Sequence, residues 1–187
     1  TDRARYADYI ILDSDQLSAF GAESLLIGGL RRQGQTNMEL LVGADKLIVD
    51  NKGSVLKGPE ILLAASGNVN VLGGARIATE GKLTGKSGDL RVLSLYGEVK
   101  HDNGTSWTTT DDYLIHGALD RGVVMRVSSG EQIDLLRNGA AVSALNALRN
   151  DPDALAALNA KRAEMKLGPV TLNGGVLTIA DGASIIA

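Results

Sequence analysis

The chain has no cysteine among its 187 residues and only six aromatic side chains. The absence of cysteine excludes a disulfide scaffold, a thiolate zinc site and a cysteine nucleophile. Because aromatic residues are scarce, the core must be built from Leu, Ile, Val and Ala. Glycine is abundant instead, with 23 residues against a usual share of about 7%, so we expect frequent sharp turns.

Neither sign of charge dominates, and no long hydrophobic run is present. The 22 acidic and 19 basic side chains give a formal net charge of −3. Without a basic cluster, this balance argues against nucleic acid or an acidic membrane surface as the main partner. The longest stretch free of charged residues, 61–75, contains Asn and Gly and is too short to span a bilayer. We therefore expect no nucleic-acid partner and no direct membrane insertion.

Short apolar runs recur along the first half of the chain, separated by polar residues or glycine. From Leu40 onward they arrive about every seven or eight residues. This is the spacing of short strands joined by tight bends, since each run is too short for a helix. The runs begin at Ile10, Leu25, Leu40, Leu47, Ile61, Val69 and Ile77.

Two windows repeat at an offset of 37 residues. Residues 7–13 match 44–50, and residues 21–26 match 58–63 without a gap, with seven identities in all. Strands this short cannot bury an apolar side alone, but stacked coils can. The repeat therefore predicts an all-β solenoid with coils about 4.8 Å apart. Three runs give about 22 residues per coil, whereas the 37-residue offset fits two shorter coils, and an excursion at residues 31–37 would reconcile the two.

The composition becomes helical toward the C-terminus. Ser129 followed by Gln132 fits a capping box, and Asp151 before Pro152 fits an N-cap with proline at the first helical position. We expect helices at residues 140–149 and from Pro152 to about Lys166. The predicted organisation is listed from the N-terminus: β coils at 1–130 with a polar loop at about 97–116, a helical insertion at 131–168, and a resumed β coil at 169–187.

Glycine-flanked aliphatic stretches occur at residues 19–29, 58–65 and 124–130 and again at 175–185. They resemble the repeat region of filamentous haemagglutinin-type exoproteins. The resemblance implies a right-handed parallel β-helix with an α-helical insertion, as the central segment of a large bacterial protein exported by two-partner secretion. Because the chain starts at Thr1 without a leader, we expect an excised or processed piece.

The same resemblance implies a role and a location. Such proteins form rods at the bacterial cell surface or in the extracellular medium, and they act in adhesion, biofilm formation, virulence or contact-dependent toxin delivery. The implied partners are the outer-membrane transporter of the parent protein and a glycan or protein on a host or bacterial surface. Unpaired terminal coils would also favour end-to-end self-association. A passive stalk for a distant toxin or adhesive tip is the alternative role.

The polar segment at 97–116 carries the candidate ligand contacts. An exposed indole among hydroxyl groups can stack on a sugar ring, although it can equally cover the side of the fold. Neither His101 nor His116 has the spacing of a metal or acid–base pair, so we expect both in a solvated loop. The candidate contacts are Trp107, Thr105, Ser106 and Tyr113.

Acidic residues at equivalent repeat positions offer a catalytic alternative. In polysaccharide-active β-helix enzymes calcium sits among flanking carboxylates, and Asp13, Asp15 and Asp50 would imitate part of that arrangement. Calcium needs six to eight oxygens, however, and carboxylates more than one coil apart would be separated by about 10 Å. We expect instead that such strand-end acids stay solvated and discourage edge pairing. The sequence therefore predicts no catalytic, metal-binding or cofactor-binding residue, and no enzyme.

Overall fold

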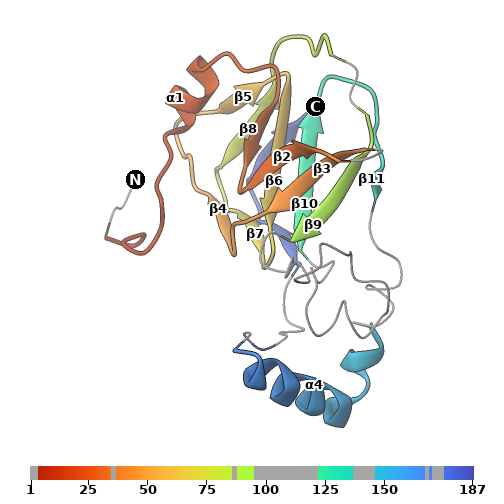
Figure 1. Ribbon diagram of the computed structural model, residues 1–187. Coiled ribbons are helices and arrows are strands. Elements are labelled where there is room, and N and C mark those ends of the chain that lie inside the picture. The colour runs from red at the N-terminus through yellow and green to blue at the C-terminus, as the bar shows by residue number, and fades with distance from the viewer. Residues whose placement is uncertain are drawn as a thin grey trace.

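The computed structural model describes residues 4–34, 37–85, 88–94, 122–136, 146–166, 169 and 175–187. Within these ranges short strands dominate (Figure 1). The strands are β1 (Leu25–Ile27), β2 (Gly29–Gln33), β3 (Met38–Val42), β4 (Leu47–Val49), β5 (Leu56–Gly58), β6 (Glu60–Ala65), β7 (Val69–Val71), β8 (Arg76–Thr79), β9 (Leu90–Ser94), β10 (Val123–Ser128), β11 (Leu135–Leu136), β12 (Leu177–Ile179) and β13 (Ser184–Ile186). The helices with defined bounds are α1 (Ser14–Ala19) and α4 (Pro152–Glu164).

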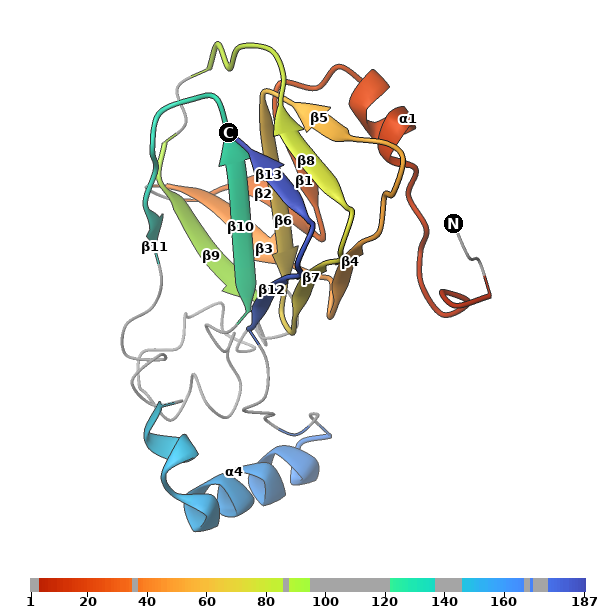
Figure 2. The same cartoon turned by 180° about the vertical axis from the view of Figure 1, so that it is seen from behind.

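The described strands pair into four small sheets. Two sheets are purely parallel, with orders β12-β7-β4 and β13-β8-β5. The other two are mixed: β1-β6-β10, in which β10 runs antiparallel, and β11-β9-β3-β2, in which β2 runs antiparallel. The views from both sides show these sheets gathered around a common centre, with β6 and β10 crossing it (Figures 1 and 2).

The prediction of a right-handed parallel β-helix is wrong. The described strands form separate mixed or parallel sheets, and no solenoid runs through them. A 22-residue step does occur, because Leu47 pairs with Val69, and a similar step joins β5 to β8. Among the described strands, it occurs only between these two neighbouring pairs. The third strands of these two sheets, β12 and β13, come from the end of the chain.

Two antiparallel strands account for the interruption. The excursion predicted at residues 31–37 lies in a β2–β3 hairpin, in which Gly29 pairs with Val42. On the other side of the fold, β10 reverses direction along β6 and pairs with it over six residues, from Val123 opposite Ala65 to Ser128 opposite Glu60. Since a parallel solenoid needs each coil to advance in one direction, both reversals end its repeat.

Strand β6 is buried on both faces and divides the core into two clusters. Its odd-numbered side chains, such as Ile61 and Leu63, pack with residues of β4, β5, β7, β8 and β10. The even-numbered Leu62 and Ala64 pack with residues of β3 and β9. All four of these side chains are fully buried. A continuous aliphatic run, rather than an alternating one, is what a strand covered on both faces requires.

Gly28 permits the sharp turn between β1 and β2. Its φ of 91° lies in the left-handed region, where residues with a Cβ are strained. A Cβ at this position would also collide with the backbone carbonyl of Ala64. The Gly28 carbonyl accepts hydrogen bonds from the amides of Gly43 and Ala44, each at 2.9 Å. The turn therefore fixes the β2–β3 hairpin against β6.

Helix α1 lies along the outer edge of β5 (Figure 1). Asp13 caps its N-terminus, since the carboxylate accepts hydrogen bonds from the amides of Asp15 and Gln16. The Ser18 hydroxyl accepts the Lys57 amide hydrogen at 2.9 Å. Because Lys57 is in β5, this bond satisfies a strand-edge donor that would otherwise point to solvent. No helix was expected at this position from the sequence.

The first of the predicted apolar runs does not form a strand. Residues 10–12 have no regular secondary structure, and Ile10 is 91% exposed. Their repeat counterparts, 47–49, form β4. The first matched pair of windows, 7–13 and 44–50, therefore repeats in sequence but not in conformation, whereas in the second pair Leu25 and Leu26 are in a strand, as are Leu62 and Leu63.

The helical predictions for the C-terminal part are partly confirmed. Helix α4 begins at Pro152, and the Asp151 carboxylate accepts a hydrogen bond from the Ala154 amide at 2.9 Å. It ends at Glu164, two residues before the expected end. Residues 146–149 are also helical. The capping box at Ser129 is wrong, because residues 131–134 are not helical and 135–136 form β11.

Replacing Leu63 by Ala tests the central position of β6. We expect a loss of about 2–5 kcal/mol in the free energy of unfolding, because the substitution leaves a cavity among fully buried side chains. Urea denaturation of the purified chain measures it. Leu30→Ala is the matched control: Leu30 is 58% exposed on β2 and should change stability by less than about 0.5 kcal/mol. Equal losses in both variants would contradict the assignment of the core.

Candidate functional site

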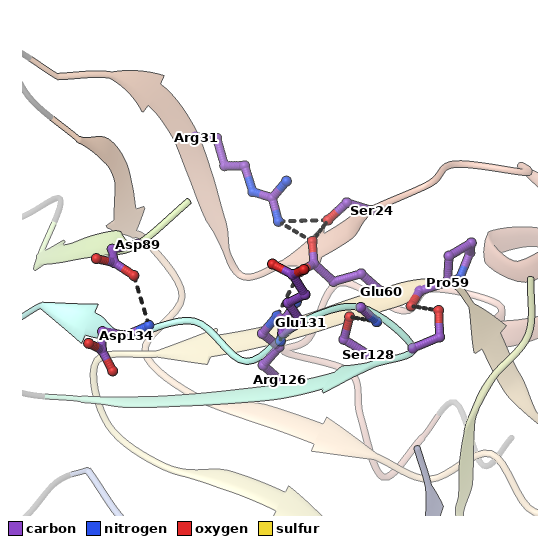
Figure 3. A network of polar contacts seen from close by, with 11 residues as sticks. Ser24, Arg31, Pro59, Glu60, Asp89, Arg126, Ser128, Glu131 and Asp134 are labelled. Carbon is purple, nitrogen blue, oxygen red and sulfur yellow. Dashed lines mark hydrogen bonds and ion pairs between the residues drawn. The ribbon is translucent and has the colours of Figure 1, made fainter. Parts of the chain in front are cut away.

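A buried carboxylate at the start of β6 accepts hydrogen bonds from three side chains in the described part of the chain. Glu60 is 3% exposed. Figure 3 shows its side chain between Ser24 and Arg31 on one side and Arg126 on the other. Burying an ionised carboxylate is costly unless it is paired and hydrogen-bonded, so the neighbours of Glu60 determine what the site can do.

Both carboxylate oxygens of Glu60 accept hydrogen bonds from charged donors. The Arg31 guanidinium lies 2.9 Å from Oε2, and Nε of Arg126 lies 2.7 Å from Oε1. The Ser24 hydroxyl donates to Oε2 and also accepts a 2.6 Å hydrogen bond from Arg31. Arg126 reaches further, to the backbone carbonyl of Glu131 at 2.9 Å. Charge-assisted hydrogen bonds of this kind are roughly twice as strong as neutral ones.

The strand register brings these residues together. Leu25 of β1 pairs with Ile61, which places Ser24 at the level of Glu60. Arg126 of β10 pairs with Leu62, one position diagonal to Glu60 on the same face of the sheet. Arg31 comes from β2, the outer strand of the hairpin. Three side chains, up to 66 positions from Glu60 in the sequence, therefore converge on its carboxylate from three different strands or strand ends.

The surroundings of Glu60 lower its pKa below the ordinary value of 4.5. Burial is the largest single influence and raises the pKa, because it disfavours the charged form. It is outweighed by the hydrogen bonds from Ser24, Arg126 and Arg31, together with the positive charge of Arg126. Glu60 is consequently ionised throughout the neutral range.

This arrangement stabilises the fold and is poorly suited to acid–base chemistry. A general base works best with a pKa near the working pH, and the pKa of Glu60 is shifted away from it. Its oxygens are already held by two guanidinium groups. Beside the cluster lies a pocket of about 210 Å³, lined by Ser24, Arg31 and Glu60 and by apolar side chains that include Leu83 and Ile133. The pocket exposes the edge of the cluster rather than a free carboxylate.

The predicted ligand contacts fall in a part of the chain that the structure does not describe. Trp107, Thr105, Ser106 and Tyr113 all lie within residues 95–121, outside the described residues, as do His101 and His116. Their proposed contact with a sugar stays a prediction.

The acidic residues of the repeat do not meet at one site. Asp13 caps α1, whereas the Asp50 carboxylate accepts a hydrogen bond from the Tyr6 hydroxyl at 2.7 Å. Glu23 accepts a hydrogen bond from the Thr84 hydroxyl. Within the described ranges, no group of three or more acidic or histidine side chains is placed to hold a metal ion.

Sequence reasoning missed the burial of Glu60. The interpretation that strand-end acids stay solvated is wrong for this residue, although Asp13 is exposed as expected. A signal was present in the sequence. Arg126 is a charge at a single position of the aliphatic run that forms β10, and Glu60 directly precedes the longest uncharged stretch of the chain. Opposite charges inside two buried strands predict a partnership between them.

Comparison with protein-family models, with curated proteins and with solved structures gave no match to this chain. Among the described helices, none combines the length and the apolar character needed to cross a bilayer.

Replacing Glu60 by Gln tests the structural role of the cluster. The substitution keeps the shape of the side chain but removes the buried anion that pairs with the largely buried Arg126. We expect the free energy of unfolding to fall by about 3–5 kcal/mol, measured by urea denaturation at pH 7. The Lys57–Glu80 ion pair, 2.7 Å long with both side chains exposed, supplies the control. Glu80→Gln should cost less than about 1 kcal/mol, and a similar cost for both variants would refute the role.

The effect of Glu60→Gln on the free energy of unfolding should depend on pH. Because the pKa of Glu60 is lower in the folded chain than in the unfolded chain, its ionisation stabilises the fold above the unfolded value of about 4.5. That contribution is lost as the pH falls through the folded value. The stability difference between the wild type and Glu60→Gln should thus be constant from pH 6 to 8 and should narrow below about pH 4.5. Denaturation curves across this range measure it, and a gap that widens on acidification would contradict the assignment.

Proposed function

We propose that this chain is a structural and adhesive segment of a secreted bacterial surface exoprotein, without catalytic activity of its own. The observation that carries the proposal is the state of the Glu60 carboxylate, which is ionised and held by two arginines. Such a group stabilises the packing of strands instead of exchanging protons with a substrate. A module that withstands exposure at a cell surface needs that kind of internal support.

The arrangement of the four stretches that resemble haemagglutinin repeats supports the same proposal. Residues 19–29 and 58–65 contain β1 and β6, residues 124–130 contain all of β10 except its first residue, and these three strands form a single sheet. The last stretch, residues 175–185, contains β12 and most of β13. Three of the four stretches thus lie on neighbouring strands of one sheet. Their solenoid context is absent from the described residues, so the proposal concerns the role of the segment and not a β-helical rod.

The enzymatic alternative has less support from the geometry. An acidic flank that binds calcium and polysaccharide requires its carboxylates to converge. Asp13 is engaged at the start of α1, and Asp50 is bonded to Tyr6 near the end of β4. The passive-stalk alternative predicts the same fold but no ligand, so a binding measurement separates it from adhesion.

The proposal is tested by binding of the fluorescently labelled chain to cultured epithelial cells and to bacterial cells, measured by flow cytometry. We expect saturable binding to at least one of them and no release of products from pectate or alginate. A Leu63→Asp variant, which buries an unpaired charge and should not fold, controls for adhesion of unfolded protein. Saturable binding by the wild type alone supports an adhesive segment. Its absence from both cell types would favour a passive stalk, and product release would establish an enzyme.

A further inference from the structure

A second pocket lies on the outer face of the parallel sheet β12-β7-β4, away from Glu60. Its volume is about 270 Å³, close to the lower limit of pockets that hold small ligands. The lining combines aromatic, polar and aliphatic side chains from four parts of the chain. The residues that form its floor and wall are Ile48, Asn70, Thr178, Arg5, Tyr6 and Tyr9.

The floor is a row of three side chains, one from each strand. Asn70 of β7 pairs with Ile48 of β4 on one side and with Thr178 of β12 on the other. The residues before and after Asn70 in β7, Val69 and Val71, are fully buried. Because side chains alternate along a strand, Asn70 and its two neighbours point outward. Strand spacing separates them by about 4.8 Å each, which gives an apolar, an amide and a hydroxyl group in line.

The wall is a turn that carries two tyrosines. Their rings meet edge to face with centres 5.9 Å apart, and the Arg5 guanidinium lies 5.4 Å from the centre of the Tyr6 ring. The Tyr6 hydroxyl donates to Asp50, next to the end of β4, and the Tyr9 amide donates to the Tyr6 carbonyl at 3.0 Å. These contacts fix the turn beside the sheet, and Tyr9 remains 41% exposed.

The polar groups of the floor are available to a ligand. Neither the side-chain amide of Asn70 nor the hydroxyl of Thr178 has a hydrogen-bond partner among the described residues. Asn70 is half-buried and Thr178 is exposed. A side-chain amide supplies two donors and two acceptor sites, and a hydroxyl supplies one donor and two acceptor sites. Groups of this kind, set at a fixed spacing beside an aromatic ring, orient a ligand that has several hydroxyls.

We propose that this pocket, here called the tyrosine groove, binds a saccharide. A pyranose has one face of C–H groups, which packs against an aromatic ring, and a rim of hydroxyls, which pairs with amides and hydroxyls. Tyr9 supplies the ring, while Asn70, Thr178 and Arg5 supply the polar contacts. A single arginine that already stacks on Tyr6 is a weak site for a phosphate, which favours several donors. The inference rests on the proposed adhesive function and names its ligand class.

Saturation-transfer NMR on the full chain tests the groove, with chitobiose, lactose, cellobiose and sialyllactose as probes. We expect transfer to at least one of the four sugars. Tyr9→Ala should weaken that binding at least tenfold, since it removes the stacking surface, and Asn70→Ala should weaken it through the lost amide contacts. Tyr9→Phe keeps the ring and should bind nearly as well. Phe20→Ala removes an aromatic side chain that is 81% exposed and outside the groove, and it should leave binding unchanged.

Two results would overturn the proposal that the tyrosine groove binds a saccharide. One is the absence of saturation transfer to all four sugars. The other is equal binding by the wild type, Tyr9→Ala and Asn70→Ala, with circular dichroism confirming that both variants fold. The failure of the groove is distinguishable from failure of the proposed function. Saturable cell binding that survives Tyr9→Ala would leave adhesion intact and place it elsewhere. Sugar binding by a chain that adheres to no cell would retain the groove and refute the adhesive role.

Discussion

The need to satisfy one buried carboxylate organises the strands around β6. Glu60 begins a strand whose remaining side chains are buried on both faces, so water cannot solvate it and protein donors must. Those donors come from β2, from the residue before β1, and from β10. Any arrangement that placed these strands differently would leave either a buried anion or a largely buried Arg126 without its partner, at a cost of several kcal/mol. Aliphatic packing is tolerant of small displacements, but this cluster is not.

Local structure followed from the sequence more reliably than pairing did. The runs at Leu25, Leu40, Leu47, Ile61, Val69 and Ile77 all lie in strands, and the Asp151–Pro152 signal correctly marked the start of α4. Both depend on neighbouring residues alone. The β-helix prediction required each strand to pair with the next coil, and that choice is made by distant segments: β10 and β12 take places that a continuing repeat would have filled. A regular spacing of apolar runs determines where strands form, but not their direction or partner.

Neither polar site was predictable in the same way. In the Glu60 cluster, Glu60 and Arg126 lie 66 residues apart in the sequence, and in the floor of the tyrosine groove Asn70 and Thr178 lie 108 residues apart. No short motif spans such distances. What the sequence does carry is each residue's local anomaly: an arginine inside the aliphatic run of β10, and an asparagine between two valines in β7. Both anomalies mark a side chain facing away from the nearest apolar layer: Arg126 pairs with Glu60, and Asn70 lines the pocket proposed as the tyrosine groove.

Helix α1 has a consequence for how this chain can meet copies of itself. Exposed strand edges are templates on which further chains can pair, and the sheet β13-β8-β5 would present one at β5. Its Lys57 amide is already bonded to the Ser18 hydroxyl, and the helix lies where an incoming strand would have to stand. Head-to-tail growth through this sheet is therefore blocked at one end unless α1 is displaced. The six-residue helix covers the free edge of β5, so no further chain can extend the sheet at that edge.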